Sequence, residues 1–126
     1  MNESMYSGLT LAYIGDAYYE IFFRKWNASK GITKVNDLHK ETIKYTCAEF
    51  QARAIKYLIE SETLSEDELG VFKRGRNSNT NKTRKTLSLA DYNAATGLEA
   101  LIGYLNITGK TERADEILNI IKDNVL

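Results

Sequence analysis

Proline is absent from this 126-residue sequence, so no proline ring interrupts a helix at any position. Glycine occurs only 8 times, and Tyr, Lys, Glu, Leu and Ile recur at helical spacing. These features predict an all-α fold built as a bundle of about six helices. The length favours one domain, residues 1–126, with a single core.

Charge and composition narrow the functional classes. The sequence has 17 basic and 17 acidic residues, which argues against a nucleic-acid binder held by overall charge. No apolar run reaches the ~18 residues that a membrane span needs, so we expect no membrane contact. The single cysteine, Cys47, cannot form an internal disulfide, which favours a cytoplasmic location. A lone cysteine of this kind is more often a packing residue than a nucleophile.

The expected helices are separated by recognisable end signals. They run from about Ser4 to Asn27, over 36–61 with a break near Tyr45–Cys47, from Ser65 through Phe72, from Ser88 to about Gly109, and from a cap at Thr111 onwards. We expect Asn36 or Asp37 to cap the second helix and Ser65 to open a capping box. Residues 76–87 are polar without a period, and a loop of this length is usually functional or disordered.

The first expected helix contains two acids in apolar surroundings. A helical step of about 100° per residue places five side chains on one face: Leu9, Tyr13, Asp16, Glu20 and Phe23. We therefore expect the two carboxylates to point inward or into a cleft. A carboxylate there is costly unless it is paired, hydrogen-bonded or bound to a metal ion.

Glu99 is a further acid in an apolar segment. It is the only charged residue between Asp91 and Lys110, and Gly97 and Gly103 permit another helix to approach closely. Taken singly, Asp16 and Glu99 are each more simply explained by pairing with an arginine or capping a helix. Two acids in the two most apolar segments favour a hard oxygen site for Mg²⁺ or Mn²⁺.

A basic segment offers a surface for phosphates. No acid interrupts its six cations, which are Lys73, Arg74, Arg76, Lys82, Arg84 and Lys85. Such a group neutralises phosphates, and neighbouring polar residues such as Asn77 can add hydrogen bonds. A solvated surface loop is the commoner explanation of a charge run. The lesser candidates for phosphate contact are Asn36, His39 and Lys40.

These motifs resemble a known family. Leu11-Ala-Tyr-Ile-Gly-Asp-Ala-Tyr-Tyr-Glu20 is similar to the signature helix of ribonuclease III catalytic domains, and Leu98-Glu-Ala-Leu-Ile-Gly103 resembles their second acidic helix. Thr33-Lys-Val-Asn-Asp-Leu-His-Lys40 and Phe72-Lys-Arg-Gly-Arg-Asn77 narrow the resemblance to the Mini-III branch, the short bacterial form.

The resemblance implies an all-α ribonuclease III fold, a homodimer and Mg²⁺-dependent endonucleolytic cleavage of double-stranded RNA. Mn²⁺ is an expected substitute, and the expected substrate is the precursor of the large-subunit (23S) ribosomal RNA. Asp16 and Glu99 match the metal-binding catalytic acids of the family. Glu20, one turn from Asp16, is expected to support the site.

The sequence also departs from full-length ribonuclease III. Two further acids of that enzyme correspond here to Ala12 and Thr96, so water and RNA phosphate must complete the metal coordination. No room remains for a separate double-stranded-RNA-binding domain, so the basic segment must supply much of the RNA contact. Two alternatives stay open: a non-catalytic binder of double-stranded RNA, for instance a ribosome-associated protein, and a helical protein-interaction module.

Overall fold

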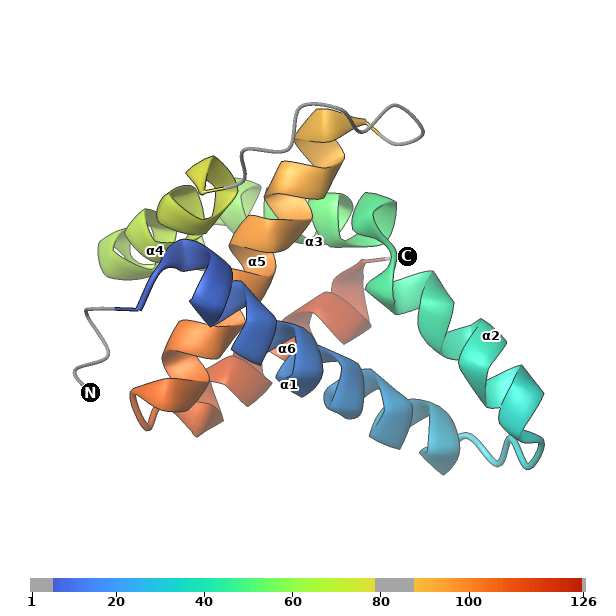
Figure 1. The fold of residues 1–126 in the computed structure, drawn as a ribbon. Helices are drawn as coiled ribbons and strands as arrows, with labels where there is room; N and C mark the ends of the chain where they lie inside the picture. The colour runs from blue at the N-terminus through green and yellow to red at the C-terminus, as the bar shows by residue number, and fades with distance from the viewer. Residues whose placement is uncertain (1–5, 79–87, 126) are drawn as a thin grey trace.

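The computed structural model describes residues 6–78 and 88–125. Within these ranges the chain forms helices and no strand, which confirms the all-α prediction. The helices are α1 (Gly8–Ser29), α2 (Val35–Thr46), α3 (Ala48–Glu60), α4 (Glu66–Asn77), α5 (Leu89–Ile107) and α6 (Thr111–Asn124) (Figure 1). Three of the predicted basic residues, Lys82, Arg84 and Lys85, lie outside the described ranges.

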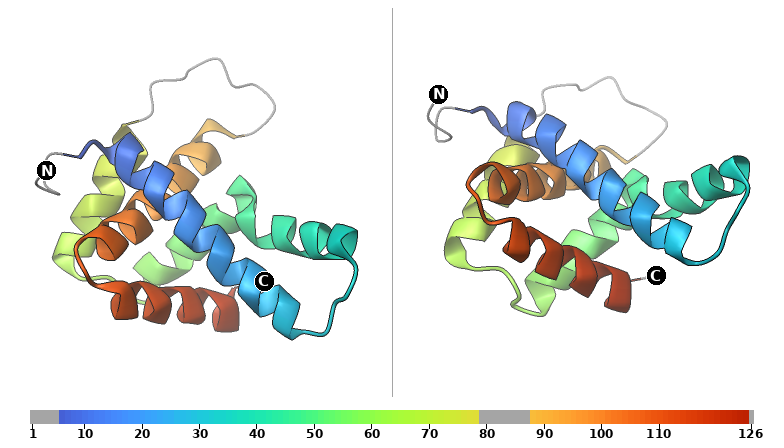
Figure 2. Two further views of the ribbon diagram at one scale, coloured as in Figure 1. Left: turned by 60° about the horizontal axis from the view of Figure 1, so that its bottom comes forward. Right: turned by 90° about the horizontal axis from the view of Figure 1, so that it is seen from below.

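Helix α5 lies at the centre of the molecule. It packs most extensively against α1, then against α4 and α3, while α6 runs beside α1 (Figure 2). Its apolar residues, among them Leu98, Leu101, Ile102 and Leu105, are almost completely shielded from solvent. This explains why the segment is apolar on nearly every face, since helices contact it from several sides. No helix in the described ranges is long and apolar enough to cross a membrane.

Three predicted helix starts were wrong by a few residues. Helix α1 begins at Gly8 rather than near Ser4, because the Ser7 side chain caps it by accepting a hydrogen bond from the backbone N–H of Thr10 at 3.1 Å. Helix α2 begins after Lys34, which keeps an extended backbone and makes no side-chain cap. Asn36 and Asp37 therefore already lie in the first turn. Likewise, Thr111 is the first residue of α6 and not its cap.

The predicted break between the second and third helices is confirmed at Cys47. This residue ends α2 and begins α3 with an extended backbone, φ −70° and ψ 152°. The turn lets Tyr45 enter the core, where its ring stacks on Phe23 with centroids 4.9 Å apart. The chain there follows tertiary packing rather than continuing a helix.

The predicted capping box at Ser65 is confirmed and extends into an ion pair. The Ser65 hydroxyl accepts from the Glu68 backbone N–H, and the Glu68 carboxylate accepts from the Ser65 N–H. Glu68 also receives two hydrogen bonds from Arg113 of α6, at 2.8 and 2.9 Å. The Arg113 guanidinium holds the pKa of this buried carboxyl below its usual value. The start of α4 is thereby fixed to α6.

Helices α1 and α5 touch through their backbones. A Cβ added at Gly15 would lie 1.7 Å from the carbonyl oxygen of Glu99, and one added at Gly103 would lie 1.9 Å from that of Leu11. Neither distance is possible for real atoms, so only glycine fits at either position. The expected close approach at Gly103 is confirmed, and its partner at Gly15 was not predicted.

We expect Gly15→Ala to lower the free energy of unfolding by about 1–3 kcal/mol, because the new methyl group forces α1 and α5 apart. Gly70→Ala is the matched control. Gly70 lies in α4 with no atom near the position of an added Cβ, so alanine should stabilise the helix by about 0.5–1 kcal/mol. Urea unfolding of both variants checks this prediction, and a loss of stability that is equal in both would contradict it.

Candidate active site

The crossing of α1 and α5 brings Asp16 and Glu99 together. Asp16 follows Gly15, and the carbonyl of Glu99 is the group that Gly15 contacts. Burial, a hydrogen bond with Asp16 and the charge of that acid together raise the pKa of Glu99 to about 8. At neutral pH Glu99 therefore keeps its proton on the protein alone. Among the described residues, neither forms an ion pair with an arginine or lysine.

The predicted face of α1 that carries Leu9, Tyr13 and Asp16 is not buried against the other helices. Leu9 and Tyr13 are 48% and 80% exposed, and Asp16 is exposed with them. The buried face of α1 instead includes Leu11 and Gly15, because the close contact with α5 requires glycine there. Asp16 sits at the edge of this contact and lines a shallow hollow of about 580 Å³, so the alternative of a cleft is the one observed.

A second cavity adjoins Glu99 from the side of α3. It has a volume of about 330 Å³, and its lining includes Cys47, Gln51, Thr96 and Glu99. Cys47 is half-buried with a free thiol. The Thr96 hydroxyl donates to the carbonyl oxygen of Tyr92 at 3.1 Å. Glu99 thus lines the cavity on the α3 side, whereas Asp16 lines the hollow on the α1 side.

Gln51 and Tyr19 belong to this site and were not predicted. Gln51 is only 2% exposed, and its side-chain amide acts on both Glu99 and Tyr19, lowering the pKa of each group against the effect of burial. The Tyr19 hydroxyl donates to the backbone carbonyl of Tyr45 at 2.5 Å. The sequence signal was present: Gln51 is a lone polar residue on a face of α3 that otherwise buries Phe50, Ala54, Ile55 and Leu58.

The other predicted positions around the acids have structural partners. Glu20 forms an ion pair with Arg24, one turn further along α1, at 2.6 Å. Its supporting role in the site stays a prediction. Ala12 is buried in a small apolar cluster with Leu11 and Ala100. A carboxylate at Ala12 would be costly in these surroundings.

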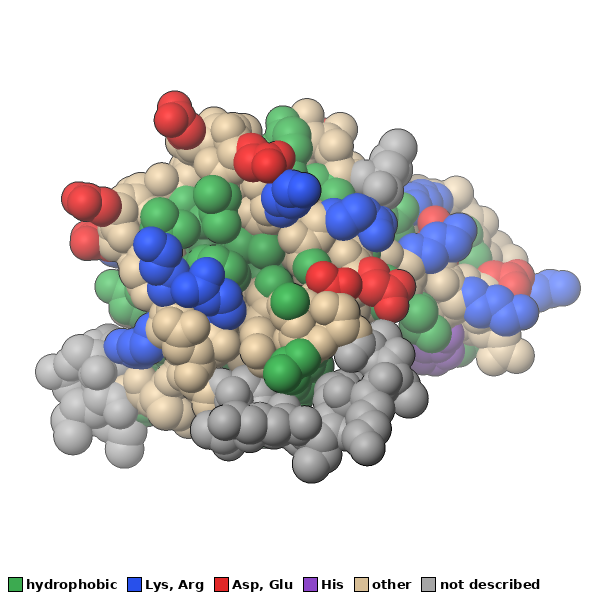
Figure 3. All heavy atoms as spheres, turned by 90° about the horizontal axis from the view of Figure 1, so that it is seen from above, with side chains coloured by type: hydrophobic (Ala, Val, Ile, Leu, Met, Phe, Trp, Pro, Cys, Tyr) green, Lys and Arg blue, Asp and Glu red, His purple; other side chains and the backbone are tan. Residues whose placement is uncertain are grey.

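The described basic candidates lie on two helices. Lys73, Arg74 and Asn77 are exposed on α4, and Figure 3 shows basic side chains gathered on that side of the molecule. The Arg74 guanidinium donates to the backbone carbonyl of Tyr6 at 2.9 Å, and the guanidinium of Arg76 lies 5.5 Å from the ring of Phe72.

The remaining candidates, Asn36, His39 and Lys40, are exposed on α2. In Figure 1, α2 and α4 lie at opposite sides of the molecule. The structure therefore divides the predicted RNA contacts into two separate surfaces.

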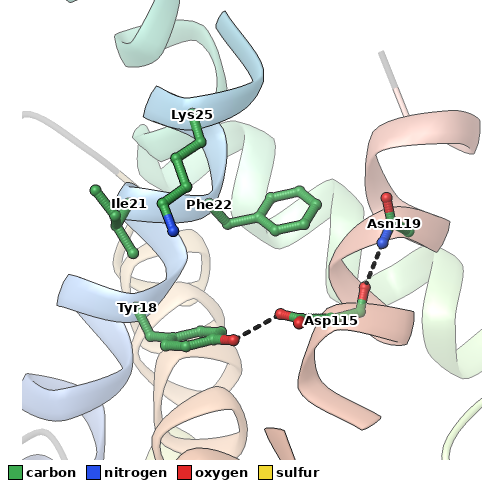
Figure 4. A pocket seen from close by; sticks show the side chains of 6 residues that line it. All are labelled: Tyr18, Ile21, Phe22, Lys25, Asp115 and Asn119. Atoms are coloured by element: carbon green, nitrogen blue, oxygen red, sulfur yellow. Dashed lines mark hydrogen bonds between the residues drawn. The ribbon is translucent and has the colours of Figure 1, made fainter. Parts of the chain in front are cut away.

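A further hollow lies between α1 and α6, and neither Asp16 nor Glu99 lines it. It has a volume of about 220 Å³, and Lys25 extends into it toward Tyr18 (Figure 4). The Tyr18 hydroxyl donates to the carboxylate of Asp115 at 2.6 Å. Burial and this hydrogen bond raise the pKa of Tyr18 to about 12. These partners join α1 to α6, which is a structural role.

The model of the Ribonuclease III domain matches residues 9–110. The chain belongs to the ribonuclease III family. A Mini-ribonuclease 3 from Acholeplasma laidlawii is 43% identical over 114 residues, which cover 90% of each protein. The Mini-ribonuclease 3 of Streptococcus pneumoniae is 39% identical over 119 residues, which cover 94% of this chain and 93% of that protein. These relatives place the chain in the Mini-ribonuclease 3 branch, as the motifs predicted.

The fold agrees with this family placement. The crystal structure of a Fusobacterium nucleatum protein superposes with a TM-score of 0.84 at 31% sequence identity, and the match covers 94% of this chain and 93% of that one. Within this ribonuclease III fold, the paired acids lie on the two helices that carry the family motifs.

The paired carboxylates fit a divalent cation of the Mg²⁺ type. Asp16 and Glu99 concentrate negative charge that the protein alone relieves with a proton, and a cation relieves the same charge. No group of three or more Asp, Glu, His or Cys side chains in the described ranges is placed to hold a metal ion. Mg²⁺ commonly uses one or two carboxylates together with water and substrate phosphates, so two acids are enough.

The raised pKa of Glu99 predicts how the stability of the protein varies with pH when a chelator removes divalent cations. The folded state keeps the Glu99 proton up to about pH 8, whereas the unfolded chain releases it near the usual value of 4.5. The free energy of unfolding should therefore fall as the pH rises between these values. Relative to Glu99→Gln, which cannot titrate, the wild type should lose roughly 1–4 kcal/mol over that range. Urea unfolding at several pH values checks this, and parallel curves for the two proteins would contradict it.

Proposed function

We propose that this chain is a Mg²⁺-dependent endoribonuclease that hydrolyses double-stranded RNA, with Asp16 and Glu99 as its metal ligands. The observation that carries the proposal is the pairing of these two carboxylates at the backbone contact between α1 and α5. In a helical interaction module, two neighbouring carboxylates would repel each other and lower stability without serving binding. The similarity to proteins named Mini-ribonuclease 3 supports the same conclusion.

The residues of the site divide the work as follows. Asp16 and Glu99 would hold the cation between two helices whose glycine contact fixes their separation. The chemistry that Mg²⁺ would supply there is a lowered pKa of a water molecule and stabilisation of negative charge at the scissile phosphate. Asp16, being exposed, reaches the substrate side, while Glu99 anchors the site from α5. Hydrolysis then leaves a 5′ phosphate and a 3′ hydroxyl, and Glu20 supports Asp16 from the next turn.

The basic residues give the RNA contact. Lys73 and Arg74 are exposed on α4, and neutralising backbone phosphates with such cations supplies most of the affinity for a duplex. Asn36, His39 and Lys40 offer a second contact from α2. We include Lys82, Arg84 and Lys85, which lie outside the described residues, among the proposed RNA contacts. The substrate we propose is the 23S ribosomal RNA precursor, cleaved in the cytoplasm.

A homodimer accounts for the exposed apolar face of α1. Leu9, Tyr13 and Ile21 recur at helical spacing on this face and are 48%, 80% and 44% exposed. They lie beside Asp16, and Tyr13 and Ile21 line the same hollow as that acid. A second copy seated here would cover the apolar side chains and bring two sites together, one for each strand of a duplex.

We expect purified protein to cleave a long RNA duplex only when Mg²⁺ or Mn²⁺ is present. Asp16→Asn should lower kcat about 10³-fold or more, because the stabilisation of transition-state charge by the cation is worth several kcal/mol. Binding of the duplex should persist in this variant. Gel analysis of cleavage products and of bound RNA measures both effects.

Asp115→Asn is the matched control for this experiment. Asp115 is an acid of α6 that accepts from Tyr18 in the separate hollow, so its change should leave cleavage close to that of the wild type. Equal cleavage by Asp16→Asn and wild type would remove Asp16 from the site. Duplex binding by the wild type without cleavage in any divalent cation would instead favour a non-catalytic RNA-binding protein.

Tyr13→Glu should weaken dimerisation by about 30-fold or more, as expected for a charge placed at an interface anchor. Ile59→Glu, on α3 and 40% exposed, is the control and should not change the association state. Sedimentation equilibrium of the three proteins provides the measurement. A wild type that stays monomeric at high micromolar concentration would exclude the dimer.

A further inference from the structure

The cavity on the α3 side of Glu99 contains a buried amide with no evident structural use. Gln51 lines this cavity together with Glu99 and is 2% exposed. Its Nε2 atom is buried, and no hydrogen-bond partner for it is present in the described part of the chain. A buried N–H group without a partner costs folding free energy, which points to a role for Gln51 beyond packing.

The neighbours of Gln51 limit what its amide can serve. Tyr19 and Glu99 are the two groups on which the side chain acts. The Tyr19 hydroxyl already has an acceptor, the carbonyl of Tyr45. Glu99 instead has a carboxyl group whose other neighbour is Asp16. An amide N–H bonds strongly to an ionised carboxylate and only weakly to a protonated carboxyl group.

We propose that Gln51 is a positioning residue for Glu99: from α3, its side-chain amide donates to the ionised Glu99 carboxylate and orients it to bind the cation beside Asp16. The inference rests on the proposed function, because it concerns the ligand-binding form of Glu99.

The chemistry of glutamine suits this position better than a charged side chain. A lysine would form an ion pair with Glu99 and compete with the cation for it. A third carboxylate would add negative charge beside Asp16 and Glu99. A neutral donor stabilises the ionised ligand without competing for it. In metalloproteins, loss of such an outer partner typically weakens the metal site about 10–100-fold.

The test measures Mn²⁺ binding to the full chain without RNA. Gln51→Met keeps the length and volume of the side chain but removes the donor, and Gln51→Asn keeps an amide but withdraws it by one methylene. We expect both variants to bind Mn²⁺ about 10–100-fold more weakly than the wild type by calorimetric titration. Saturating Mn²⁺ should restore cleavage, since only the occupancy of the site is affected.

Asn27→Leu is the matched control. Asn27 is also a fully buried amide with one unpartnered atom, but it contacts Thr42 and lies about 16 Å along α1 from Asp16. Its change should alter the melting temperature and leave Mn²⁺ affinity within twofold of the wild type. Wild-type Mn²⁺ affinity in a folded Gln51 variant overturns this inference alone. A wild type that neither binds Mn²⁺ nor cleaves RNA overturns the proposed function and this inference with it.

Discussion

The direct contact between the backbones of α1 and α5 is the constraint on which the rest of the structure depends. Two glycines, Gly15 and Gly103, remove the side chains that would keep the helix axes apart. Helices normally pack 8–10 Å apart because side chains fill the space between them. Asp16 and Glu99, which lie beside this crossing, can therefore interact across it. Larger residues in place of Gly15 and Gly103 would hold the two helices further apart. The remaining helices surround this pair and hold it.

The pairing of Asp16 and Glu99 is electrostatically unfavourable. Glu99 lies in surroundings that disfavour its charge, and its nearest acidic partner, Asp16, adds to that cost. A protein selected for stability alone would replace such a pair with apolar residues. A cation bound as proposed would relieve this repulsion as it binds. The burial of the apolar cluster around α5 contributes the folding free energy that offsets this unfavourable term.

Much of this architecture follows from the sequence, and the misses have identifiable physical causes. The helices, the break at Cys47 and the capping box at Ser65 follow from local propensity and side-chain hydrogen bonds, which depend on neighbours in the chain. The orientation of α1 does not, because its apolar residues surround the helix and only the contact at Gly15 decides which face is buried. Gln51 was missed for a similar reason: it lines a cavity together with Glu99 of α5, and that tertiary contact cannot be read from the sequence of α3.

Helix α1 also connects two surfaces that are distant in the molecule. It has 22 residues and is therefore about 33 Å long, with Asp16 in its first half and the partners of α2 near its end. Asn27 bonds to Thr42, and Lys30 pairs with Glu41, so α2 is joined to the far end of this helix. A helix of this length acts as a stiff rod. An RNA contact on α2, as proposed above, would therefore be held by α1 at a fixed distance from Asp16.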